Sequence, residues 1–181
     1  MMDLNKYTFM RFKLIFFSFF LSFFFINAQT TKDSKAELEK VIDVFRVSII
    51  ERNDFEKFSN LFLHDSITWA AIITGDTKKR VLQQKPDFTF QTSNYKAFFE
   101  ELKDGSEEKF YNVKIDVRNE FATISFDYSF NVNSKTQNWG TEYWSLILIN
   151  NIWKITSVTW SQNMQKLEAC PFESKDLLEM N

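Results

Sequence analysis

The sequence predicts an α+β domain, in which about three N-terminal helices pack on one face of a curved antiparallel sheet. Two patterns predict this class. Apolar residues recur at helical intervals in three segments between residues 35 and 102, and from residue 111 onward they alternate with polar residues. The expected order of elements is helix, helix, strand, helix and then four strands.

Residues 1–28 are interpreted as a secretory signal peptide. A basic start precedes 13 uncharged and mostly apolar residues, and the small residue Ala28 follows at a suitable cleavage site. A membrane-spanning helix would need roughly 20 such residues. We therefore expect cleavage after Ala28, export to the periplasm or the medium, and no membrane attachment of the mature chain. The expected organisation of that chain is a linker (29–34), a folded domain (35–162) and a polar tail (163–181).

The first helix is expected over residues 35–51. Ser34 and Glu37 have the spacing of a capping box, and the apolar residues that follow recur at helical intervals. Asp54 provides the N-cap of a short second helix. The apolar face of that second helix comprises Phe55, Phe58, Leu61 and Phe62.

A first strand is expected over residues 66–73, before the turn at Gly75. Residues 77–92 are expected to form a solvated loop, because they contain the charge run 78–80 without a Gly-rich turn. A third helix should start near Ser93 and stop before Gly105.

Four strands should complete the domain, since apolar and polar residues alternate there with a period of two. Their expected ranges are 111–118, 122–131, 139–149 and 152–161, with turns at 119–120 and 150–151 and a polar loop at 133–138.

Two-residue turns would set the register of both hairpins. The first hairpin would pair Val117 with Ala122, Ile115 with Ile124, Val113 with Phe126, and Tyr111 with Tyr128. The second would pair Leu148 with Trp153, Leu146 with Ile155, Trp144 with Ser157, and Glu142 with Thr159. One sheet face would then be apolar near the turns and more polar at the far end, while Tyr143, Val158 and Trp160 would lie on the outer face.

Composition excludes several classes of site. The chain has 1 His and 1 Cys, so a multi-histidine metal centre, a Cys-based zinc site and a disulfide framework are excluded. Its 3 glycines are isolated, which leaves no glycine-rich phosphate loop. A net charge of -2 provides no electrostatic footprint for nucleic acid. We expect no cofactor, no metal and no nucleic-acid partner.

Three segments carry a resemblance to a known family. SNLFLHDSITW (59–69), GTEYWSL (140–146) and WKI (153–155), in this order, resemble the nuclear-transport-factor-2-like superfamily, particularly its SnoaL-like exported bacterial members. The resemblance spans about residues 35–162. It implies a cone-shaped domain with a pocket between helices and sheet, and often a homodimer. Its isomerases, dehydratases and cyclases shuttle protons with an acid, a His or a Tyr in that pocket.

The polar end of the buried sheet face supplies the candidate site. The expected ligand-binding residues are Trp69, Tyr111, Tyr128, Glu142, Trp144, Ser157 and Thr159. Glu142 is also the best-placed catalytic acid, and its alternative role is a strand-end carboxylate bonded to Thr159 or solvent. His64 is the second catalytic candidate, because it is the only side chain that titrates near neutrality unaided. Turn chemistry at a helix–strand junction is the favoured explanation of His64.

Three functions remain open. The first is an exported domain that binds a small hydrophobic or aromatic ligand. The second is a cofactor-free isomerase, dehydratase or cyclase with Glu142 or His64 as proton shuttle. The third is a protein-binding or dimerisation module that uses the outer sheet face.

Overall fold

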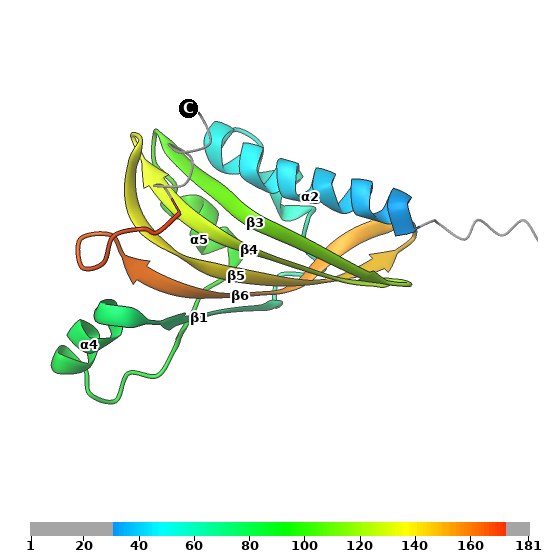
Figure 1. Cartoon of the computed structure of the whole chain (residues 1–181). Coiled ribbons are helices and arrows are strands. Elements are labelled where there is room, and N and C mark those ends of the chain that lie inside the picture. The colour runs from blue at the N-terminus through cyan, green and yellow to red at the C-terminus, as the bar shows by residue number, and fades with distance from the viewer. Residues whose placement is uncertain (1–30, 173–181) are drawn as a thin grey trace, which may run out of the picture. The chain divides into compact units, whose positions relative to one another are not determined.

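A six-stranded sheet organises residues 31–172, the part of the chain that the computed structural model describes (Figure 1). The helices are α2 (Thr31–Glu51), α3 (Phe55–Ser59), α4 (Gly75–Gln84) and α5 (Tyr95–Glu101). The strands are β1 (Thr68–Ile73), β2 (Gln91–Thr92), β3 (Ser106–Arg118), β4 (Phe121–Val132), β5 (Lys135–Ile149) and β6 (Ile152–Met164). The predicted signal peptide lies outside the described residues.

The sheet has the order β2-β1-β6-β5-β4-β3. Strands β3 to β6 form an antiparallel meander, β1 joins β6 in parallel, and β2 pairs antiparallel with β1. In Figure 1, α2 runs beside β3 over one face of the curved sheet. The predicted α+β class is confirmed.

The core lies between α2 and the covered face of the sheet. The inward face of α2 consists of Leu38, Ile42, Phe45 and Ile49, all buried at helical spacing. Phe45 packs on Trp144 of β5 with ring centroids 4.7 Å apart and on Phe58 of α3 at 5.3 Å. The described residues include no helix with the length and apolarity to cross a membrane.

Local capping signals place two helix starts. The Asp54 side chain accepts a hydrogen bond from the Lys57 amide (2.8 Å) at the start of α3, and Asn94 accepts one from the Ala97 amide (2.9 Å) at the start of α5. Ser34, however, is not the N-cap of α2, because the helix already begins at Thr31 and Ser34 is buried inside it.

Residues 77–92 are not a loop, contrary to the prediction. They contain most of α4 and all of β2. The Thr77 hydroxyl accepts a hydrogen bond from the Met164 amide (2.8 Å), and the Asp76 amide donates to the Glu168 carboxylate (3.3 Å). These partners are 87 and 92 residues away, so the local sequence gives no sign of the contacts that hold this segment on the sheet.

The polar loop predicted at 133–138 is also wrong. Asn133 and Ser134 alone form the turn, both with positive φ (51° and 60°), and β5 begins at Lys135. This strand start is polar, so it lacks the alternation that the prediction required. Strand β3 likewise begins at Ser106 rather than at residue 111.

Bulges change the register in the outer half of each hairpin. Near the turns the predicted pairs Ile115–Ile124 and Leu146–Ile155 are present. Beyond the bulge between Tyr111 and Lys114, Tyr111 pairs with Asp127, and the predicted pairs Val113–Phe126 and Tyr111–Tyr128 are absent. A bulge inserts one residue into one strand and moves later side chains to the other face.

The second bulge lies in β6, where Ser145 pairs with Ser157 while its neighbour Leu146 pairs with Ile155. The predicted pairs of Trp144 with Ser157 and of Glu142 with Thr159 are therefore wrong: Trp144 pairs with Val158, and Glu142 with Trp160. Val158 and Trp160 were expected on the outer face, and this prediction is wrong: Val158 is completely buried, and Trp160 faces the cavity described below. Tyr143 does lie there and is 57% exposed.

Candidate functional site

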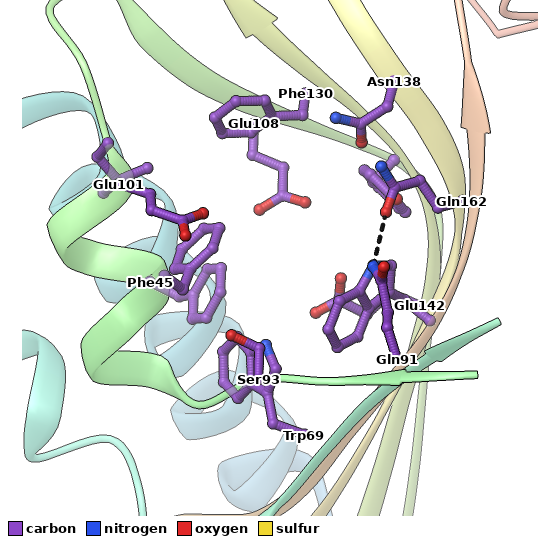
Figure 2. A pocket seen from close by; sticks show the side chains of 14 residues that line it. Phe45, Trp69, Gln91, Ser93, Glu101, Glu108, Phe130, Asn138, Glu142 and Gln162 are labelled. Atoms are coloured by element: carbon purple, nitrogen blue, oxygen red, sulfur yellow. Dashed lines mark hydrogen bonds between the residues drawn. The ribbon is translucent and has the colours of Figure 1, made fainter. Parts of the chain in front are cut away.

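A cavity of about 320 Å³ lies between α2, α5 and the covered sheet face (Figure 2). Six aromatic side chains from five different elements supply its apolar walls. They are Phe45, Trp69, Phe98, Tyr128, Phe130 and Trp160. Ring centroids are 6.2 Å apart for Phe45 and Phe98 and 6.0 Å apart for Trp69 and Trp160. The cavity is within the size range of small-molecule pockets, roughly 300–1,000 Å³.

Two buried carboxyl groups face this cavity. Glu108 on β3 is 5% exposed and Glu142 on β5 is 6% exposed. Glu108 stands opposite Phe130 and Glu142 opposite Phe126, so both acids lie on the inner face, on either side of β4. The position of Glu108 follows from the register on the far side of the bulge in β3, and that of Glu142 from the regular pairing of β5 with β4.

The environment favours the protonated form of both acids. Burial raises the pKa of Glu142 to about 7, although the Trp144 indole N–H, which donates to Glu142 Oε1 at 2.5 Å, opposes this shift. Burial and the neighbouring Glu142 charge raise the pKa of Glu108 well above its ordinary value. Near neutral pH the pair therefore retains at least one proton and can both give and accept one.

Tyr128 lies on β4 between the two acids. Burial, then the charges of Glu142 and Glu108, raise the pKa of Tyr128 well above its ordinary value, so the phenol keeps its proton. Its hydroxyl donates to the Ser161 carbonyl oxygen at 3.0 Å. Gly140, opposite Tyr128, permits this arrangement, because a Cβ there would lie 1.9 Å from the same oxygen.

Polar side chains contribute amide, hydroxyl and carboxyl groups to the remaining lining. Gln91 Nε2 donates to Gln162 Oε1 at 3.1 Å, which joins β2 to the end of β6 (Figure 2). Ser93, Asn138 and Glu101 complete the polar lining. The cavity thus combines aromatic walls with a small number of hydrogen-bonding groups, the usual composition of a ligand pocket.

Four of the predicted site residues contribute to this cavity or hold a residue that does. Trp69, Tyr128 and Glu142 line it. Trp144 is 1% exposed and does not line the cavity itself. Its indole N–H donates a hydrogen bond to Glu142, which does.

The other three predicted ligand residues lie elsewhere because of the two bulges. Tyr111 packs on Phe172 with ring centroids 5.6 Å apart, and its hydroxyl lies 3.2 Å from Ser129 Oγ. Ser157 and Thr159 lie on the side of β6 opposite Val158 and Trp160, and Thr159 is exposed.

His64 is exposed and does not line the cavity. Its Nδ1 accepts a hydrogen bond from the Ser66 amide at 3.1 Å, which is turn chemistry. The neighbouring Asp65 bonds instead to Lys96 and Tyr95, and these bonds keep the pKa of Asp65 below its ordinary value. His64 and Asp65 therefore form no catalytic dyad.

Sequence reasoning missed Glu108, Glu101 and the inward orientation of Trp160. Glu108 belongs to the charged run 107–109, which gives no sign that one of its acids is buried. Alternation extended back from Phe110 would have placed Ser106, Glu108 and Phe110 on one face. The prediction instead extended the alternation of residues 113–117, which lie beyond the bulge and are therefore one residue out of step with this face. Among the described residues no group of three or more His, Cys, Asp or Glu side chains is arranged to hold a metal ion.

Sequence comparison identifies no matching family model and no matching curated protein. The structure, however, is similar to an NTF2-like protein of unknown function from Shewanella baltica OS155, with a TM-score of 0.52, 12% identity, and coverage of 75% of this chain and 98% of that one. It is similar to an NTF2-like protein of unknown function from Methylobacillus flagellatus KT, with a TM-score of 0.51, 14% identity, and coverage of 75% and 97%.

A third similar structure is a protein of unknown function with a cystatin-like fold from Nostoc punctiforme PCC 73102, with a TM-score of 0.51, 15% identity, and coverage of 74% and 93%. At these identities the comparisons define the fold alone. Residues 31–172 have the nuclear-transport-factor-2-like fold, as the resemblance implied.

Proposed function

We propose that this domain binds a small organic molecule in the cavity between α2, α5 and the sheet. The observation that carries the proposal is a space of about 320 Å³ that the domain's own side chains leave open, with aromatic walls and two buried carboxyl groups. A stable fold normally fills its interior to a high packing density, so an unfilled space of this size favours an occupant.

Export is part of the same proposal. Residues 1–28 have the layout of a secretory signal, so the mature domain would meet its ligand outside the cytoplasm.

Substitution of a wall residue tests ligand binding. Indole, 2-phenylethanol and 2-phenylethylammonium serve as probes, and native mass spectrometry and calorimetry measure their binding. Trp160→Ala should weaken at least one probe about tenfold, because it removes an aromatic wall worth about 1.4 kcal/mol of contact.

Trp139→Ala is the matched control. Trp139 is a tryptophan of similar size that packs on Phe172 and donates to the Glu168 carbonyl, outside the cavity. Its replacement should leave probe affinity within twofold. Failure of all three probes to bind the unaltered domain would contradict the proposal.

A second function is favoured by the paired acids. A carboxylic acid and a carboxylate in one cavity can remove a proton from one position of a bound substrate and return it at another. The pKa of Glu142 at about 7 suits both steps near neutral pH. Cofactor-free isomerisation, dehydration or cyclisation would use this chemistry, with Glu142 and Glu108 rather than His64 as the proton-transferring groups.

A further inference from the structure

We propose that the cavity selects an organic cation, such as a protonated amine on a small aromatic or aliphatic body. This inference rests on the proposed binding function and names the chemical class of the ligand.

The charge of the lining points to a cation. Three acids line the cavity, Glu101, Glu108 and Glu142, and no Lys, Arg or His among residues 31–172 does. Two basic side chains on nearby elements pair with acids outside the cavity: Lys96 of α5 pairs with Asp65, and Arg52 pairs with Asp104. An anionic ligand would face carboxyl groups without any compensating positive charge.

Glu108 is the strongest single observation. Its side chain is more than nine-tenths buried, it points into the cavity, and no described residue donates a hydrogen bond to its carboxylate (Figure 2). Glu142 has one such donor, the Trp144 indole. A buried carboxylate normally has a charged or hydrogen-bonding partner, so a cation with N–H donors would supply what Glu108 lacks.

The aromatic walls fit the same ligand. The faces of Trp, Tyr and Phe rings carry negative electrostatic potential and attract ammonium groups within about 6 Å of the ring centroid. Trp69, Trp160 and Tyr128 line the space into which the acids also project. A neutral ligand would use the ring surfaces but would leave the charge of an ionised acid without a partner.

Cation binding should also displace protons. The titratable groups that face the cavity are Glu101 from α5, Glu108 from β3, Tyr128 from β4 and Glu142 from β5, while the lining residues from α2, β1, β2 and β6 are uncharged. Because burial favours the protonated form of Glu108 and Glu142, a cation that favours the carboxylate form should release protons as it binds.

Three probes of matched size test the selection: 2-phenylethylammonium, 2-phenylethanol and phenylacetate, titrated calorimetrically at pH 7.5. The ammonium should bind at least tenfold more tightly than the alcohol, and phenylacetate should bind least. The ammonium affinity should rise between pH 5.5 and 8, with proton release revealed by buffers of different ionisation enthalpy.

Variants on one strand locate the charge. Glu108→Gln should reduce ammonium affinity at least tenfold and change the affinity for the alcohol less than twofold. Glu107→Gln is the control, because it removes the same charge from the adjacent position on the opposite face of β3. Thermal unfolding of both variants establishes that they are folded.

The outcomes separate the two proposals. Equal affinity for the alcohol and the ammonium, or an ammonium affinity unchanged in Glu108→Gln, would overturn the cation proposal and leave small-molecule binding standing. Failure of all three probes while indole still binds would overturn the cation proposal alone, and failure of indole as well would overturn both.

Discussion

Glu142 illustrates how a single buried residue can work against the stability of a fold. It is 6% exposed, and burial raises its pKa to about 7 from an ordinary value of 4.5. Between these two pH values the folded chain holds a proton at Glu142 that the unfolded chain has lost. This contribution to stability is therefore greatest below pH 4.5, falls as pH rises, and reaches its minimum above pH 7.

Glu142→Gln should remove this pH dependence. The amide is neutral at every pH and retains an oxygen to accept the Trp144 indole hydrogen bond. We expect the variant to match the original chain at pH 4.5 and to exceed its free energy of unfolding at pH 8 by on the order of 2 kcal/mol. Urea denaturation at both pH values measures the difference.

Glu107→Gln controls for the loss of a charge on the sheet and should show no such gain. A Glu142→Gln variant that is less stable than the original at pH 8 would contradict the assignment of a costly buried charge to this residue.

Among single residues, those with a local signal were the ones predicted. Asp54 and the asparagines of the turns have side chains suited to caps and positive φ, and Asn119, Asn150 and Asn151 indeed have φ of 55°, 52° and 62°. Glu142 was predicted because it belongs to an uninterrupted alternating strand. Glu108 was not, since nothing local distinguishes it from Glu107.

At the scale of elements, the bulge in β3 decides which side chains reach the cavity. Asn112 has a positive φ of 52°, and its Nδ2 donates to Asp127 Oδ2 at 2.7 Å. The extra residue moves Tyr111 to the outer side, and Phe110, whose ring centroid is 4.3 Å from that of Phe126, occupies the inner face instead.

Asn112→Val should destabilise the domain more than Asn112→Gly, by about 1–2 kcal/mol, because a β-branched residue strongly disfavours the left-handed backbone that the bulge requires. Chemical denaturation measures the difference. Both variants lack the amide bonded to Asp127, so the comparison isolates the backbone conformation. Equal stability of the two would show that the bulge does not depend on this conformation.

At the scale of the whole molecule, the two ends of the described chain pack in different ways. Thr31 begins the helix that covers the sheet, whereas residues after β6 turn back, so that Phe172 packs on Tyr111 and Trp139. Residues 1–28 precede the described residues, and their role is a prediction from sequence.

The export prediction can be checked in a bacterial host that produces the full chain. Mass spectrometry of the exported protein should find Gln29 as its first residue. Replacing Phe19 and Phe20 by Arg should interrupt the apolar run and leave the uncleaved 21.6 kDa chain inside the cell. Export that persists in this variant, or a first residue other than Gln29, would contradict the predicted signal or its cleavage site.

Local periodicity was sufficient to predict the α+β class, three of the four described helices and the strands of the meander, because helix and strand patterns reflect which side chains are buried within a few residues. Three features depend instead on residues far apart in the chain: the contacts of α4, the two bulges, and the proximity of Glu108 to Glu142. One inserted residue reverses every later side chain of a strand. The composition of the cavity therefore became visible only once the strands were paired in space.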